Sequence, residues 1–276
     1  MTAAERWREQ LAAWAIPEEI VAAAPETPWG YSTELFRSRA EGSIANDPTP
    51  TTERALEALP EDGTVLDVGV GGGATSLPLA GRAGIIVGVD GQPDMLEGFR
   101  AAAESAGVRE RTVLGSWPDV ADQVETADVA VAGHVAYNVP DLGPFAEAMG
   151  AHARHRVVLE LTERHPMTWM NELWLHFHGL IRPEGPTVDD ARSVLTEIGI
   201  DTHRQDRIVG AQNAAGGGFE RREDAIHLVR KRLCLSAERD EEVAERLGSE
   251  LRQVRGTWDV GPITRTIVTL WWDTRA

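Results

Sequence analysis

Short apolar runs alternate with helical stretches through the middle of the chain. The runs are rich in β-branched residues and fall at 64–68, 85–89, 112–114, 128–132 and 156–161. The stretches between them include 75–82, 94–105 and 142–154, which are long enough for crossover helices. This alternation predicts an α/β fold, with a parallel sheet covered by helices on both faces.

The end of the chain follows a different pattern. Residues 201–209 and 264–272 fit two final strands, and the charge-alternating stretch 236–254 between them fits helix. The spacing predicts that these strands complete the same sheet, with a helical insert between them.

The predicted elements divide the chain into two parts. Residues 1–60 are expected to form an N-terminal helical extension, or lid, packed on the core, because Trp7 and Trp14 belong to a helically spaced series. Residues 61–276 are expected to form the main domain, with a lid insert at about 163–186 and a helical insert at about 220–256.

Composition and charge exclude several classes of protein. Hydrophobic residues make up 42% of the chain and charged residues 26%, which excludes a disordered or fibrous protein. The net charge of −17 repels phosphate backbones, so nucleic acid is not an expected partner. Cys234 is the only cysteine, which rules out an intramolecular disulfide. The sequence lacks an apolar leader and a membrane-length apolar run, so we expect a cytoplasmic protein with no membrane partner.

The strongest local motif is Val65-Leu-Asp-Val-Gly-Val-Gly-Gly-Gly-Ala-Thr-Ser76, an expected strand that runs into glycines and then a helix. Glycines allow a tight turn and a close approach to a ligand, and a helix N-terminus offers unpaired N–H groups. Gly69, Gly71 and Ala74 also fit the dinucleotide pattern G-x-G-x-x-G/A. The motif indicates a nucleotide-like ligand, and a purely structural strand-to-helix turn is the alternative.

An acid before the glycines separates these readings. Asp67 with Gly69, Gly71 and Gly73 resembles the first motif of the class I S-adenosylmethionine-dependent methyltransferases. In that family the acid holds the loop and, directly or through water, the amino group of the methionine moiety. Asp90 ends the next strand about 20 residues later and matches the family's ribose-binding acid, a position that dinucleotide enzymes also use.

The resemblance covers roughly residues 50–165 by motif and the rest by topology. It implies a Rossmann-like, seven-stranded sheet in the order three, two, one, four, five, seven, six, with an antiparallel last strand. It also implies S-adenosylmethionine as cofactor, S-adenosylhomocysteine as product, and in-line methyl transfer to a small-molecule acceptor. The further residues expected around the cofactor are Val70, Gly91, Gln92, Met95, Ser116, Trp117 and His134. Trp117 stacks on the adenine in this interpretation, or is a core residue in the alternative.

Candidate catalytic residues follow the fourth and fifth strands, at the sheet edge where open α/β folds bind ligands. His134 is the first candidate for a general base and His165 the second, because histidine titrates near neutrality. Tyr137 is expected to orient the acceptor. Each of the three is otherwise a hydrogen-bonding or packing residue.

Aromatic residues suggest where the acceptor binds. The candidates are Trp29 and Tyr31 in a proline- and glycine-containing loop, and Trp169, Trp174 and Phe177 after the fifth strand. The alternative is that the second group only fastens an insert to the domain. The nearby histidines lack metal-ligand spacing, so no metal is expected.

Two other functions remain open. An NAD(P)-dependent oxidoreductase is favoured by Gly69, Gly71 and Ala74 and opposed by Asp67. A non-catalytic S-adenosylmethionine-binding protein is also compatible with the motifs. The sequence does not identify the acceptor atom or distinguish a monomer from a homodimer.

Overall fold

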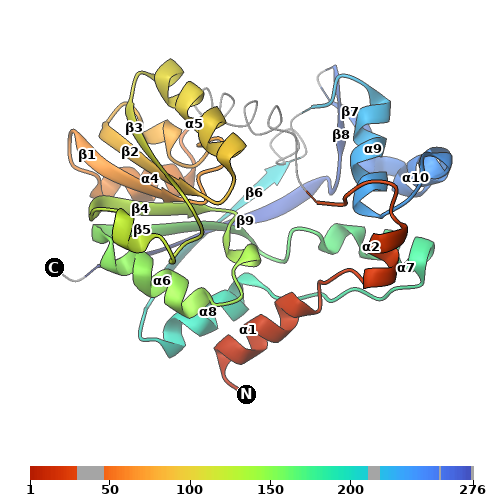
Figure 1. Cartoon of the computed structure of the whole chain (residues 1–276), viewed down its shortest axis with the longest axis horizontal. Coiled ribbons are helices and arrows are strands. Elements are labelled where there is room, and N and C mark those ends of the chain that lie inside the picture. The colour runs from red at the N-terminus through yellow and green to blue at the C-terminus, as the bar shows by residue number, and fades with distance from the viewer. Residues whose placement is uncertain (30–46, 211–217, 255, 275–276) are drawn as a thin grey trace.

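The computed structural model describes residues 1–29, 47–210, 218–254 and 256–274. A seven-stranded sheet forms the centre, in the order β3-β2-β1-β4-β5-β9-β6 (Figure 1). Its strands are β1 (Gly63–Val68), β2 (Ala83–Asp90), β3 (Arg109–Leu114), β4 (Ala127–Gly133), β5 (Ala153–Thr162), β6 (His203–Gly210) and β9 (Thr264–Asp273). The last strand is antiparallel to both of its neighbours and the other pairs are parallel. The predicted fold class and strand order are confirmed.

Helices cover both faces of this sheet. The helices α4 (Pro50–Ala58) and α5 (Pro93–Ala106) lie on one face, while α1 (Ala3–Ala12), α6 (Leu142–Ala151) and α8 (Val188–Glu197) lie on the other. Successive strand residues alternate between the two buried clusters, as Val65 and Leu66 do on β1. Because both faces are buried, the strands are nearly continuous apolar runs, which made them recognisable in the sequence.

Local signals explain where several helices begin and end. Thr2 and Glu5 form a capping box at the start of α1, and Thr187 and Asp190 form one at the start of α8. Proline occupies the first turn of α5, and Gly107 ends that helix in the left-handed conformation, with a φ of 70°.

The helix expected at 75–82 is wrong. The connection between β1 and β2 contains only a 3-10 turn at Leu77–Leu79. Gly73 has a φ of 87°, so helical geometry is interrupted there. Pro78 cannot supply the N–H that a helix starting near Thr75 would need at that position. The glycine loop therefore has no α-helix N-terminus behind it.

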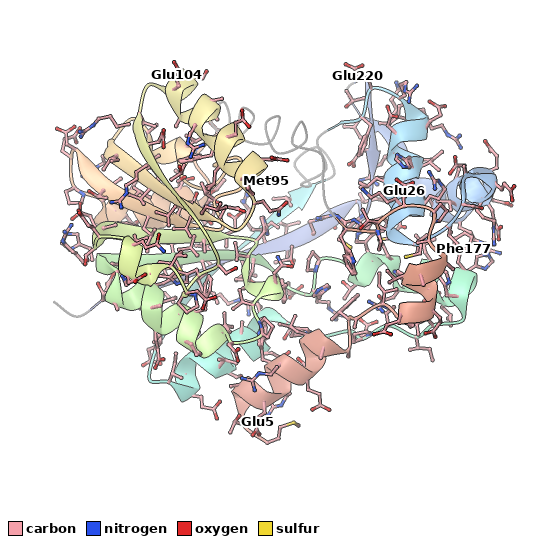
Figure 2. All side chains as sticks on the ribbon, in the orientation of Figure 1. Glu5, Glu26, Met95, Glu104, Phe177 and Glu220 are labelled. Carbon is pink, nitrogen blue, oxygen red and sulfur yellow. The ribbon has the colours of Figure 1, made fainter. Side chains whose placement is uncertain are left out.

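A second group of elements surrounds its own apolar core, separate from those on the sheet (Figure 1, right). We call it the insert lobe and define it as residues 16–24, 167–180 and, without residue 255, 219–260. It contains α2 (Glu18–Ala23), α7 (Asn171–His178), α9 (Arg222–Arg232), α10 (Asp240–Leu247) and the hairpin of β7 (Leu251–Val254) and β8 (Thr257–Val260). Figure 2 labels Phe177 and Glu220 in this lobe, and Met95 and Glu104 on α5 beside the sheet.

The helix expected at 236–254 is only partly present. It ends at Leu247, and residues 251–254 form the first strand of the hairpin. Gly248 has a φ of 50°, which ends the helix, and Gly256, with a φ of 89°, makes the turn between the strands.

No helix in the described part of the chain is long and apolar enough to cross a membrane.

Candidate functional site

The acids and glycines of the predicted cofactor motif meet where β1, β2 and β4 end. The chain turns back at Gly69, whose N–H donates to the carbonyl of Val89 at 2.8 Å. The N–H of Gly115, after β3, donates to the carbonyl of Asp90 at 2.9 Å. These bonds bring the ends of the first three strands together at the carboxyl edge of the sheet.

Asp90 holds the glycine loop in place. Its Oδ2 accepts from the N–H of Gly71 at 3.0 Å, and its Oδ1 accepts from the N–H of Gln92 at 2.9 Å. The resemblance implies a loop-holding role for Asp67, and the structure shows Asp90 bonded to the N–H of Gly71 in the loop. Asp90 lies beside the loop, whereas Asp67 lies on β1, the strand that leads into it, close to Ser76.

Asp67 is buried without a hydrogen-bond partner. The residue is 1% exposed, and neither carboxylate oxygen has a partner among the described residues. Burial raises the pKa of Asp67 to about 7, Asp90 raises it further, and the nearby Ser76 offsets part of the shift. A carboxylate in this state is favourable for a cation bound above the loop.

The loop packs directly against the segment that contains His134. A β-carbon on Gly69, whose φ is 72°, would lie 2.4 Å from Val135 Cγ2. A β-carbon on Gly133 would lie 2.0 Å from Thr75 Oγ1. The loop thus touches the residues on either side of His134, and the predicted cofactor loop and the predicted base are neighbours.

His134 pairs with an acid on the next strand. Its Nε2 lies 3.2 Å from Oε1 of Glu160, and its backbone N–H donates to the carbonyl of Glu160 at 2.7 Å. Burial alone would raise the pKa of Glu160, but His134, the Thr51 hydroxyl and the charge of Arg207 together lower it. The sequence reasoning missed Glu160, although an acid near the end of the fifth strand was the signal for it.

Comparison with known proteins agrees with this geometry. Residues 65–155 match the family model described as "Methyltransferase domain". A ubiquinone biosynthesis O-methyltransferase from Azorhizobium caulinodans is 38% identical over 86 residues, which are 31% of this chain and 34% of that protein. An uncharacterized Haemophilus influenzae protein is 31% identical over 127 residues, which are 45% of this chain and 47% of that protein. The chain therefore spans about a third and about half of the lengths of these relatives.

Solved structures show the same fold as the methyltransferase domain and its surroundings. A Bacillus halodurans protein proposed to be a methyltransferase has a TM-score of 0.53 at 15% identity, covering 83% of this chain and all of that chain (100%). The YcgJ protein of Bacillus subtilis has a TM-score of 0.52 at 14% identity, and the match covers 86% of this chain and 99% of that chain. At these identities the likeness shows the fold alone.

Most other predicted cofactor residues lie at this edge of the methyltransferase domain. Val70 and Met95 are buried, with exposed fractions of 5% and 6%. Gln92 is the N-cap residue of α5, and a β-carbon on Gly91 would lie 3.9 Å from Ser116 Oγ. Ser116 and Gly91 therefore line the same corner, after β3 and β2.

Trp117 is a core residue, as the alternative interpretation had it. It is 9% exposed, it belongs to the cluster under α6, and its indole N–H donates to the carbonyl of Phe145 at 3.2 Å. His152 packs on its ring edge, with centroids 5.1 Å apart. These contacts commit the indole to the core, so we no longer assign it to adenine stacking.

Tyr137 and His165 are not free to act on an acceptor. The Tyr137 hydroxyl donates to the carbonyl of Thr162 at 2.7 Å, and burial raises the pKa of Tyr137 above its ordinary value. The ring of His165 stacks on that of Trp14, with centroids 3.9 Å apart. Burial, with the charge of Arg182, lowers the pKa of His165 to about 4. The Nδ1 of His165 accepts from the N–H of Met167 at 3.3 Å. A ring that is both weakly basic and occupied is a poor general base.

The aromatic residues after β5 fasten the insert lobe rather than line an open site. Trp174 is 4% exposed and Phe177 packs on the same core, as does Trp169. The guanidinium carbons of Arg182 and Arg239 lie 5.0 Å from the Trp174 and Phe177 ring centroids respectively. Of the loop candidates, Trp29 is 53% exposed and Tyr31 lies outside the described residues.

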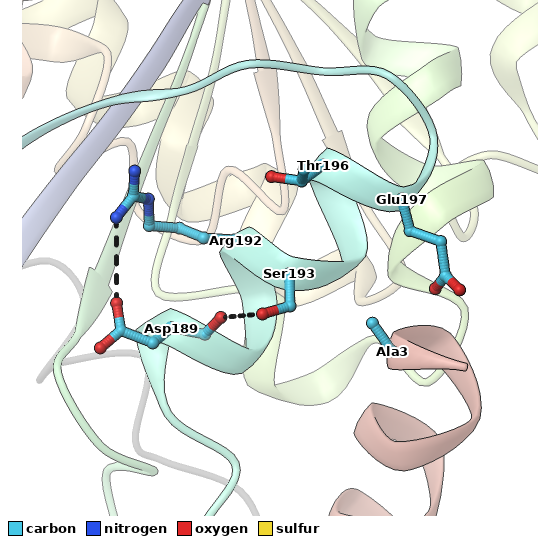
Figure 3. Close-up of a pocket in the computed structure, with 6 residues that line it drawn as sticks. All are labelled: Ala3, Asp189, Arg192, Ser193, Thr196 and Glu197. Carbon is cyan, nitrogen blue, oxygen red and sulfur yellow. Dashed lines mark hydrogen bonds and ion pairs between the residues drawn. The ribbon is translucent and has the colours of Figure 1, made fainter. Parts of the chain in front are cut away.

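The other histidines and the surface cavities lie apart from this edge. His176 Nε2 is 2.9 Å from Glu242, His178 Nε2 is 2.6 Å from the Leu233 carbonyl, and the described residues contain no metal-binding cluster of His, Cys, Asp or Glu. A depression of about 540 Å³ between α1 and α8 is lined by Ala3, Asp189, Arg192, Ser193, Thr196 and Glu197 (Figure 3). It contains none of the motif residues, and its Ser193 hydroxyl already donates to the Asp189 carbonyl at 2.8 Å. We therefore do not assign it to the function of the methyltransferase domain.

Proposed function

We propose that the protein transfers a methyl group from S-adenosylmethionine to a small-molecule acceptor. The observation that carries this proposal is the match of residues 65–155 to the methyltransferase-domain family, combined with the acids and glycines at the carboxyl edge of the sheet. The named O-methyltransferase relative, although matched over only part of its length, supports the same reaction type.

The residues at this edge fit the cofactor. Asp67 offers a buried carboxylate with no partner, which favours a bound ammonium group nearby. Gly69, Gly71 and Gly73 all have positive φ, between 50° and 87°, so the loop presents backbone without side chains. Asp90 can still accept hydrogen bonds from ribose hydroxyls, because each carboxylate oxygen has two lone pairs and accepts only one backbone hydrogen bond.

The role of the protein is to hold the reactants in line and to exclude water. When bound, S-adenosylmethionine supplies an electrophilic methyl group on a positively charged sulfur. Asp67 and Asp90 would hold the cofactor, and the segment 133–135, which packs against the loop, would bound the space where an acceptor approaches. Correct alignment alone accounts for a large part of such a rate enhancement.

The strand order disfavours the oxidoreductase alternative. The dinucleotide-binding fold is built from parallel strands, whereas here the antiparallel β9 lies between β5 and β6. Binding of NAD or NADP in place of the adenosyl ligands would nevertheless overturn the proposal, so all four ligands belong in the first binding assay.

The proposal is tested by substituting Asp90. We expect Asp90→Ala to weaken S-adenosylmethionine binding by about 10- to 150-fold, which corresponds to ~1.5–3 kcal/mol for charge-assisted hydrogen bonds. Isothermal titration calorimetry measures the change. Asp201→Ala removes an exposed carboxylate before β6 and is the control, with unchanged affinity expected. Wild-type affinity in Asp90→Ala would contradict the assignment.

A further inference from the structure

We propose that Glu160 is a positioning residue that holds His134 as the general base, and that the acceptor atom therefore carries a proton, as a hydroxyl, thiol or amine does. The inference rests on the proposed function, because it concerns the same methyl transfer. It narrows the acceptor class, which the sequence left open.

The geometry fixes which ring nitrogen of His134 is the base. Nε2 lies 3.2 Å from Oε1 of Glu160. An ionised carboxylate only accepts hydrogen bonds, so this contact favours the tautomer in which Nε2 carries the proton and Nδ1 keeps its lone pair. Nδ1 has no hydrogen-bond partner within residues 1–29, 47–210, 218–254 and 256–274. The side chain is 44% exposed, so part of the ring faces solvent.

Glu160 is itself held from its other oxygen. The hydroxyl of Thr51, on α4, donates to Oε2 at 2.5 Å and lies 2.8 Å from the hydroxyl of Thr269, on β9. Both threonines are buried, at 3% and 2% exposure. The acid is thus fixed by two neighbouring elements and does not depend on His134 for its position, as an orienting group should be.

The backbone of His134 is in an unusual conformation. Its φ is 59°, in the left-handed region that is strained for a non-glycine residue. Glycine would avoid this strain at the same position. The strained conformation places the ring beside the cofactor loop. The flanking residues Gly133 and Val135 pack against Thr75 and Gly69 of that loop. Strain of this kind concentrates at functional sites.

The chemical step balances without any further reactant. The lone pair of the acceptor atom forms the new bond to the methyl carbon, and the carbon–sulfur bond breaks with its electron pair going to sulfur. The acceptor's proton passes to Nδ1 of His134, and Glu160 stabilises the imidazolium that results. A thioether or a tertiary amine has no proton to lose and would make no use of this pair.

The first test needs no acceptor. In protein labelled with ¹⁵N-histidine at pH 8, the ring shifts of His134 should show a single tautomer with Nε2 protonated. Glu160→Gln should give a mixture of tautomers, because an amide can either donate or accept. The control is His155→Gln, at the opposite end of β5, where His155 Nε2 lies 3.8 Å from Asp128. Loss of that pair should leave the signals of His134 unchanged. An Nδ1-protonated ring, or no change in Glu160→Gln, would overturn the positioning role.

The second test measures turnover. S-adenosylhomocysteine release is followed with catechol, 2-mercaptoethanol and benzylamine as protic probes, and with dimethyl sulfide and trimethylamine as aprotic ones. We expect turnover of a protic probe, a loss of at least about 100-fold in kcat for His134→Gly with partial rescue by added imidazole, and a loss of about tenfold or more for Glu160→Gln. Affinity for S-adenosylmethionine should change less than twofold in Glu160→Gln.

The outcomes separate the two proposals. Turnover of aprotic probes alone, or an unchanged kcat in His134→Gly, would overturn the base assignment and leave the proposed function intact. Failure of the wild-type protein to bind S-adenosylmethionine would overturn the proposed function, while the tautomer measurement would still decide whether Glu160 positions His134.

Discussion

Asp67 is the residue at which stability and binding should oppose each other. Its pKa is raised from 3.8 to about 7 in the folded protein, mainly by burial. Between these values the unfolded chain releases a proton that the folded protein keeps, so the free energy of unfolding falls as the pH rises through this window. Above about pH 7, the ionisation of Asp67 lowers the free energy of unfolding by an amount on the order of 4 kcal/mol.

Replacing Asp67 by asparagine should remove this dependence. Relative to wild type, Asp67→Asn should gain stability from pH 4 to pH 8 in the absence of ligand, and it should bind S-adenosylmethionine more weakly. Denaturant unfolding at several pH values measures the first effect and calorimetry the second. Asp94→Asn, which changes an exposed carboxylate on α5, is the control and should follow the wild-type curve. Parallel curves for Asp67→Asn and wild type would show that Asp67 is not the source of the slope.

Single residues also show how far sequence reasoning reaches. His134 and His165 both follow strands, and the local sequence gave little reason to separate them. They differ in their neighbours, because Trp14 and Arg182 bury His165, while Glu160 orients an exposed His134. Those neighbours come from distant parts of the chain, so the difference was not accessible from the local pattern.

At the scale of elements, two glycine substitutions should have opposite effects. Gly69→Ala places a β-carbon 2.4 Å from Val135 at a φ of 72°, so we expect a loss of about 2–4 kcal/mol from overpacking and backbone strain. Gly98→Ala, within α5, meets nothing within 4 Å and should gain about 0.5–1 kcal/mol from helix propensity. Chemical denaturation measures both. A Gly69→Ala protein as stable as wild type would mean that the loop can move away from β4.

Elements were predictable where one signal dominated. Buried parallel strands gave continuous apolar runs, and all seven strands of the sheet were found, with ends shifted by a few residues. The helices failed where special backbone positions decided the outcome, at Gly73 and Pro78 after β1 and at Gly248 before the hairpin. The acids and glycines of the candidate site were visible in the sequence, but the pairing of Glu160 with His134 depends on the register of β4 and β5.

At the scale of the whole molecule, the residues that match the family model are only part of the folded structure. The match covers residues 65–155, while the insert lobe is built from three segments outside that range. The lobe has its own core, with no residue shared with the clusters on the sheet. Arg182 joins the two parts, since its guanidinium bonds the carbonyls of Trp14 and Ala15 and lies 5.0 Å from the Trp174 ring centroid.

Separate cores predict separate cooperative units in native-state hydrogen exchange. Trp174→Ala should cost about 3–5 kcal/mol and speed exchange in α7, α9 and α10, while α5 and α6 keep their protection. Trp7→Ala, which empties a fully buried site beside Tyr137 on the sheet side, should do the reverse. Each variant thus controls for the other under identical conditions. Equal acceleration of exchange in all five helices in both variants would show instead that Arg182 and its neighbours couple the two cores into one cooperative unit. The insert lobe would then not unfold independently of the methyltransferase domain.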